Sequence, residues 1–164
     1  MKTYNQILDR IKTIADNHRQ ISTFGQGDVW EIATSGTINY PLFWVVTKGS
    51  RIRRGEIGYE FQFLAMDMVR KDEENENDVL NDTLQIITDM ISKLKMGKFA
   101  GIDLKFSDEI KFESFTERFD EQVSGWLADL TVWTDWNWDS CAIPLKSAVS
   151  DVLELEGEEY ILLE

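Results

Sequence analysis

The chain has 164 residues, of which 43% are hydrophobic and 12% aromatic, so it is long enough and apolar enough to form one domain with a core. Its 17 basic and 30 acidic residues give a net charge of −13, which opposes unassisted binding to nucleic acid or to an anionic membrane. No apolar run approaches the ~20 residues that span a bilayer. A single cysteine, Cys141, excludes an internal disulfide, and a single histidine, His18, argues against a histidine-based triad or a multi-histidine metal site.

Two segments carry nearly all of the negative charge. Residues 67–89 hold eight acids and two bases, a net charge of −6, and residues 151–164 hold six acids and no base, again −6. The rest of the chain is close to neutral. We therefore expect a single domain over residues 1–147 with one acidic loop, followed by an acidic C-terminal arm over residues 148–164.

The first third of the chain predicts a helix followed by short β elements. Thr3 and Gln6 form a capping box, and the apolar spacing after it predicts an amphipathic helix that ends before Ile21. Residues 24–28 contain two glycines and predict a loop. Residues 29–32 predict a short strand with Trp30 at a core position.

The next segment predicts two long paired strands. Residues 42–46 form a continuous apolar run typical of a buried strand, and residues 48–50 predict a turn. From Ile57 to Phe63 apolar and polar residues alternate, which predicts a strand with one buried face, and beyond Phe63 the alternation stops, which predicts cover on both faces.

The second half predicts a loop, a helix and a further pair of strands. Residues 70–78 predict a solvated acidic loop, and Asp78 is the expected N-cap of an amphipathic helix that ends near Gly97. Phe112, Phe115 and Phe119 do not share one parity, which predicts a bulge or a bend. One face of the last strand is expected to hold Trp126, Ala128, Leu130, Val132 and Trp136, and the other Asp129, Thr131, Trp133 and Asp135. The overall expectation is an α+β fold, a twisted antiparallel sheet of two hairpins flanked by two amphipathic helices, with an acidic C-terminal tail.

No catalytic or metal-binding motif is recognisable. Residues 72–78 carry alternating acids, as calcium loops do, but Asn77 and Thr83 stand where an EF-hand needs Gly and Glu. His18 and Cys141 have no activating partner that the sequence identifies, so structural roles are expected for both. We therefore expect no enzymatic activity, no cofactor and no metal ion.

Four groups of residues are candidates for subunit contacts: a basic cluster, the acidic loop, Trp133 and apolar residues of the arm. The only dense basic cluster consists of Arg51, Arg53 and Arg54. It either contacts DNA phosphate or an acidic surface on another chain, or it is a solvated hairpin tip. In a ring it would face the acidic loop of a neighbouring copy. Trp133 is an interface candidate, and base stacking is its competing interpretation, which nearby aspartates oppose. Apolar anchors in the arm are expected to clasp an adjacent subunit. The candidate residues are Arg51, Arg53, Arg54, Asp72, Glu73, Glu74, Glu76, Trp133, Leu153, Leu155, Ile161 and Leu162.

A series of landmarks over residues 1–145 has a recognisable order. They are the opening helix, Phe24-Gly25-Gln26-Gly27-Asp28, Tyr40-Pro41-Leu42, the strand from Tyr59 to Met68, the acidic loop before the second helix, Phe119, Gly125-Trp126, and Cys141-Ala142-Ile143-Pro144. In this order the chain resembles the neck and tail-completion proteins of tailed bacteriophages, of the tail-terminator and head–tail connector type.

The resemblance implies a structural virion protein. It implies a ring of copies of the chain, 6- or 12-fold, at the end of the tail tube or between portal and tail, with neighbouring portal, neck or tail proteins as partners. DNA would pass through the ring without specific binding, and no membrane would be involved. The protein would be found in the virion neck or tail and, during assembly, in the host cytoplasm.

Two alternatives stay open. The first is a monomeric adaptor or inhibitor domain whose acidic surface mimics nucleic acid and binds a basic enzyme. The second is an enzyme of unknown class, which a pocket with several grouped carboxylates would indicate.

Overall fold

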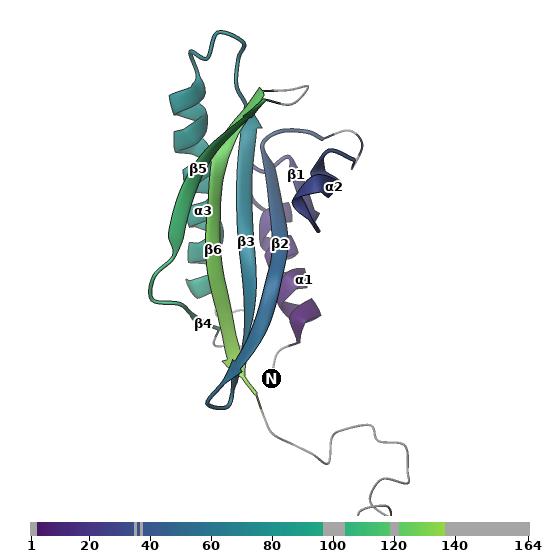
Figure 1. Cartoon of the computed structure of the whole chain (residues 1–164), viewed down its shortest axis with the longest axis vertical. Coiled ribbons are helices and arrows are strands. Elements are labelled where there is room, and N and C mark those ends of the chain that lie inside the picture. Colours follow the sequence, from purple (N-terminus) through teal and green to yellow (C-terminus); the bar gives the residue numbers. More distant parts are fainter. Residues whose placement is uncertain (1–2, 35, 37, 97–103, 119–121, 137–164) are drawn as a thin grey trace, which may run out of the picture.

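Within the residues that the computed structural model describes, the chain forms a six-stranded sheet and three helices (Figure 1). The structure describes residues 3–34, 36, 38–96, 104–118 and 122–136. The strand order is β1-β2-β3-β6-β4, and β5 also pairs with β6. The elements in chain order are α1 (Tyr4–Asp16), β1 (Thr23–Gln26), α2 (Val29–Ile32), β2 (Leu42–Arg53), β3 (Glu56–Met68), α3 (Glu76–Met96), β4 (Lys105–Phe106), β5 (Lys111–Arg118) and β6 (Gln122–Asp135).

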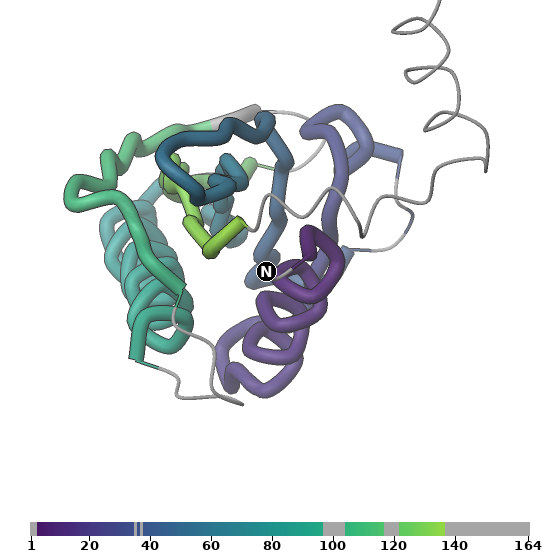
Figure 2. The backbone as a smooth tube through the Cα atoms, turned by 90° about the horizontal axis from the view of Figure 1, so that it is seen from below, coloured from purple at the N-terminus to yellow at the C-terminus, as the bar shows by residue number. Residues whose placement is uncertain are grey.

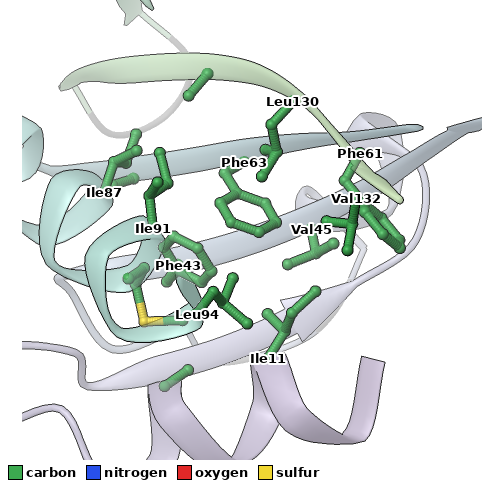
Figure 3. Close-up of a cluster of buried hydrophobic side chains, with 14 of the residues drawn as sticks. Ile11, Phe43, Val45, Phe61, Phe63, Ile87, Ile91, Leu94, Leu130 and Val132 are labelled. Carbon is green, nitrogen blue, oxygen red and sulfur yellow. The ribbon is translucent and has the colours of Figure 1, made fainter. Parts of the chain in front are cut away.

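The main core lies between one face of the sheet and helices α1 and α3. Both helices lie on the same side of the strands (Figure 2). Figure 3 shows Phe43 and Phe63 of the sheet close to Ile91 of α3, and their rings meet edge to face with centroids 5.2 Å apart. The residues that alternate along β3 and β6 in the sequence, among them Phe61, Phe63 and Leu130, face this core, so the period-two pattern predicted their burial correctly.

A second, smaller cluster covers part of the opposite face of the sheet. It contains Leu42, Trp44 and Val46 of β2, together with Leu64 and Met66 of β3, all buried. Successive residues of the 42–46 run therefore point alternately into the two clusters. This confirms the prediction of a strand buried on both faces, and it explains why the alternation stops after Phe63.

The turn between β2 and β3 lies further along the chain than predicted. β2 continues through residues 48–50, where its register with β3 shifts between Thr47 and Gly49, so the predicted turn there is wrong and the site is an irregularity in the pairing. The chain reverses at Arg54 and Gly55, whose φ angles of 43° and 79° are both positive. Two positive φ angles are what a two-residue turn needs to match the twist of the flanking strands.

Two short elements in the first third of the chain differ from expectation. Residues 24–26, expected in a loop, belong to β1, which pairs parallel with β2, so the sheet is not wholly antiparallel. Val29–Ile32, expected as a strand, is the helical turn α2. Trp30 is 66% exposed, and no strand of the described part of the chain pairs with this segment, so its β-forming residues lack a partner for strand hydrogen bonds.

The two long helices follow the sequence predictions closely. At α1 both hydrogen bonds of the capping box between Thr3 and Gln6 are present. α3 begins at Glu76, two residues before the predicted N-cap Asp78, and it buries Ile87, Ile91 and Leu94 as expected.

β5 pairs with β6 in an unbroken register from Lys111 to Arg118, so of the predicted bulge or bend the described residues contain no bulge. Phe112 packs against the main core and Phe115 against the smaller cluster, which is why the two side chains have opposite parity. Phe119, Cys141 and the acidic arm over residues 148–164 lie outside the described residues.

β6 packs so closely on β3 that a single added methyl group should lower the stability of the protein. A Cβ atom on Gly125 would lie 2.0 Å from the carbonyl oxygen of Ala65, so Gly125→Ala forces the central strands apart. We expect it to lower the free energy of unfolding by about 1–3 kcal/mol, as overpacking does, measured by urea denaturation. The control is Gly49→Ala, whose Cβ would lie 3.8 Å from Glu60 and should change stability little. Equal stability of the two variants would contradict the register of β3 and β6.

Candidate functional site

The basic cluster lies at the turn between β2 and β3, at one end of the long strands (Figure 1). Arg53 and Glu56 flank the turn and pair across it, and Arg54 occupies its first position with a positive φ. Arg51, Arg53 and Arg54 are all exposed. The cluster therefore lies at a hairpin tip, the position given in one of its two interpretations from the sequence.

Trp133 lies beneath two of these arginines. It pairs with Gly58 of β3, where a Cβ atom would lie 2.7 Å from the indole, so only a glycine leaves room for the ring. The guanidinium of Arg53 lies 3.8 Å from the ring centroid and that of Arg51 lies 5.2 Å away. Trp133 is 2% exposed, so within one subunit its surface is covered by its own chain rather than presented to a partner.

Several charged side chains around the hairpin tip form ion pairs within the chain. Arg51 Nε lies 3.0 Å from Glu60 Oε1, and Arg53 Nε lies 3.7 Å from Glu56 Oε2. Lys105 contacts Glu56 at 2.5 Å and Asp135 at 3.1 Å. The hydrogen bond to Glu56, then the one to Asp135, raises the pKa of Lys105 above its usual value. These pairs link β2, β3, β4 and β6 around the hairpin tip.

Arg54 and Lys48 differ from the other cations near the tip. Both are exposed, and neither forms a salt bridge with any residue in the part of the chain that the structure describes. Arg54 projects from the turn itself. It is therefore the cation of the cluster that is best placed to meet another molecule.

The acidic loop lies at the opposite end of β3. The side chains of two of its acids form hydrogen bonds to β5 and β6. Glu76 Oε1 accepts hydrogen bonds from Thr116 at 2.8 Å and from the buried Ser124 at 3.2 Å. Gln122 donates to Glu73 Oε1 at 3.1 Å. Glu73 and Glu76 thus attach the loop and the start of α3 to β5 and β6, a role the sequence analysis missed because these partners lie about 40 or more residues away.

Asp72 and Glu74, in contrast, are exposed and form no salt bridge among the described residues. Nearby, burial raises the pKa of Asp67, against a hydrogen bond from the Met68 N–H that lowers it, and the negative charge of Asp82 makes a smaller contribution that raises it. Asp72 and Glu74 are thus two carboxylates of the acidic loop that are available to a cation on another molecule.

The two ends are far apart. The 13 residues of β3 separate the hairpin tip from the acidic loop, and at about 3.3 Å per residue this is roughly 40 Å. Figure 1 shows the two loops at opposite ends of the sheet. Arg54 and the acidic pair of one chain cannot meet each other, because several Debye lengths of about 8 Å lie between them.

The remaining candidates give no chemical centre among the described residues. No group of three or more His, Cys, Asp or Glu residues there is arranged to hold a metal ion. His18 Nε2 lies 3.5 Å from Asp89, an acid partner on α3 that sequence spacing did not reveal. An open hollow of about 590 Å³ lies beside β2, β3 and β6 and has side chains of both charges, including Arg51, Glu60 and Lys111.

No protein-family model matches the chain, and no curated protein matches its sequence. Within the described residues, no helix is long and apolar enough to cross a membrane.

The different contacts of Glu76 and Glu74 predict different effects of their removal on stability. Glu76→Ala removes the acceptor of the buried Ser124 hydroxyl and of Thr116, so we expect a loss of about 1–3 kcal/mol in the free energy of unfolding. Glu74→Ala, in the same loop but exposed, should stay within about 0.5 kcal/mol of the unmodified chain. Chemical denaturation of both variants measures the difference, and a Glu74 variant that is the less stable of the two would contradict these assignments.

Proposed function

We propose that this protein is a structural subunit that associates head to tail with copies of itself to form a ring. The observation that carries the proposal is the separation of two complementary charges, Arg54 at one end of the sheet and Asp72 with Glu74 at the other. Each copy then offers one cationic and one anionic end. A contact between two different surfaces of the same chain repeats from copy to copy, and it closes into a ring when the rotation between copies allows.

The charge of the whole chain suits a ring around DNA. At −13 per copy, a ring presents a negative field to any polyanion that passes through it, so DNA is repelled from the wall and does not adhere to it. Together with the order of landmarks over residues 1–145, this supports a place in the neck or at the tail end of a tailed bacteriophage. There the ring would join the head side to the tail and terminate or seal the channel.

A second candidate is favoured by the exposed acids of α3. Asp78, Asp82 and Asp89 are exposed along this helix, next to the acidic loop. Carboxylates spaced along a helix can replace phosphates in binding to a basic enzyme. This function requires a monomer that competes with DNA for such an enzyme, so an assembled ring in purified virions would decide against it.

Charge reversal at the two ends tests the ring contact. In Arg54→Glu the tip repels the acidic loop of the next copy, and in Asp72→Lys/Glu74→Lys the loop repels the tip. We expect each variant alone to sediment as a monomer. When the two are mixed, the reversed tip faces the reversed loop and every unmodified tip faces an unmodified loop, so we expect assembly to return in alternating order.

Sedimentation velocity of each variant and of the equimolar mixture measures this outcome. The control is Lys12→Glu, which reverses an exposed cation on α1 and should leave assembly unchanged. Assembly of both reversed variants on their own, or failure of the mixture to assemble where the unmodified chain does, would contradict the proposed contact.

A further inference from the structure

We propose that Ile52 of one copy packs against Met68 of the next copy, so that an apolar contact lies at the centre of the contact between the charged ends. This inference rests on the proposed association of the hairpin tip with the acidic loop, and it names the apolar side chains that this association buries. Exposed ion pairs contribute little affinity individually, so a contact made of charges alone would be weak. Stable interfaces have an apolar centre inside a polar rim.

Exposed apolar side chains are few among the described residues, and one lies beside each charged end. Ile52 is 50% exposed and lies two residues before Arg54 in the sequence. Met68 is 47% exposed and lies four residues before Asp72. The other large apolar side chains that are exposed belong to neither end segment: they are Val29 and Trp30 on α2 and Met96, the last residue of α3.

Ile52 is uncovered because the β2–β3 hairpin extends past the helices. Ile52 pairs with Ile57, which packs against the main core, so it lies on the face of the sheet that carries this core. The hydroxyl groups of Tyr4 and Thr47 are hydrogen-bonded at 2.6 Å, so α1 begins beside residue 47 of β2, five residues before Ile52. Figure 1 shows the hairpin beyond the start of α1. The tip therefore presents an apolar side chain together with Arg54.

Met68 continues an apolar face of β3 beyond the smaller cluster. Leu64 and Met66 are buried in that cluster, and Met68 is the next residue on the same face of the strand. The side-chain amide of Asn75 donates to the carbonyl oxygen of Met68 at 3.4 Å, which holds the acidic loop beside it. Glu74, the neighbour of Asn75 in the sequence, is exposed. This end therefore presents an apolar side chain together with its available carboxylates.

The two ends have the same combination of groups with opposite charge. When Arg54 meets Asp72 or Glu74 of the next copy, the same approach brings Ile52 to Met68. A methionine side chain is flexible and fits irregular apolar surfaces, so Met68 adapts to the branched side chain of Ile52. Burial of both side chains removes apolar surface from water, which strengthens the association that the opposite charges align.

Polar substitutions of similar size test the apolar contact in the full chain. We expect Ile52→Thr and Met68→Gln each to weaken association about tenfold, as the loss of a half-exposed apolar side chain from an interface does. The double variant should show about the same tenfold loss, because both substitutions remove one shared contact. Sedimentation velocity measures the dissociation constants, and urea denaturation checks that each variant folds.

The matched control is Val29→Thr, because Val29 is also 50% exposed but lies on α2. It should leave the dissociation constant unchanged. Unchanged association in both single variants, or a loss of about a hundredfold in the double variant, would overturn the inference. Assembly that Arg54→Glu abolishes and Ile52→Thr leaves unchanged would overturn this inference alone, whereas an unmodified chain that stays monomeric at every concentration would overturn the proposed function as well.

Cross-linking between copies identifies the two surfaces that meet. In a Cys141→Ser background, a mixture of Ile52→Cys chains and Met68→Cys chains should form disulfide-linked dimers, and neither variant should form them alone. A mixture of Val29→Cys chains with Met68→Cys chains is the control and should stay unlinked. Dimers of either tip or loop variant alone, in place of the mixed dimer, would show that like ends meet and would overturn the proposal.

Discussion

The pairing of β3 with β2 on one side and with β6 on the other is the constraint on which the rest of the structure depends. β3 pairs with β6 over all 13 of its residues, from Glu56 to Met68, without a register shift. Two glycines permit this closeness, because Gly125 leaves room for the β3 backbone and Gly58 for the indole of Trp133. The long central strand in turn holds the hairpin tip and the acidic loop at opposite ends of the molecule.

Some charged residues at the two ends form contacts within the chain, and others are exposed and form no salt bridge among the described residues. Glu56, Glu60, Glu73 and Glu76 are used within the chain, where they hold cations at the tip or hydroxyl and amide groups at the other end. Exposed ion pairs add little stability individually, so their effect is chiefly to fix geometry. Arg54, Asp72 and Glu74 form no salt bridge among the described residues, and the contact that we propose between copies uses the separation of these charges.

Local patterns in the sequence were enough to predict the long elements. The capping box at Thr3 and Gln6, the helical spacing that leads to Ile87 and Leu94, and the alternation in β3 each depend on neighbours a few residues away, and the structure contains the elements they indicate. The parallel strand β1 and the helical turn α2 depend on which strands lie beside them, which local spacing does not encode. The burial of Trp133 likewise depends on Gly58, 75 positions away in the sequence, and on the arginines of β2.

The central claim is that this protein works by associating with copies of itself through its two charged ends. Sedimentation velocity of the unmodified 19.0 kDa chain over a range of protein and salt concentrations tests it most directly. The account predicts a discrete oligomer at high protein concentration that dissociates as salt screens the contact. A monomer at every protein and salt concentration would contradict it.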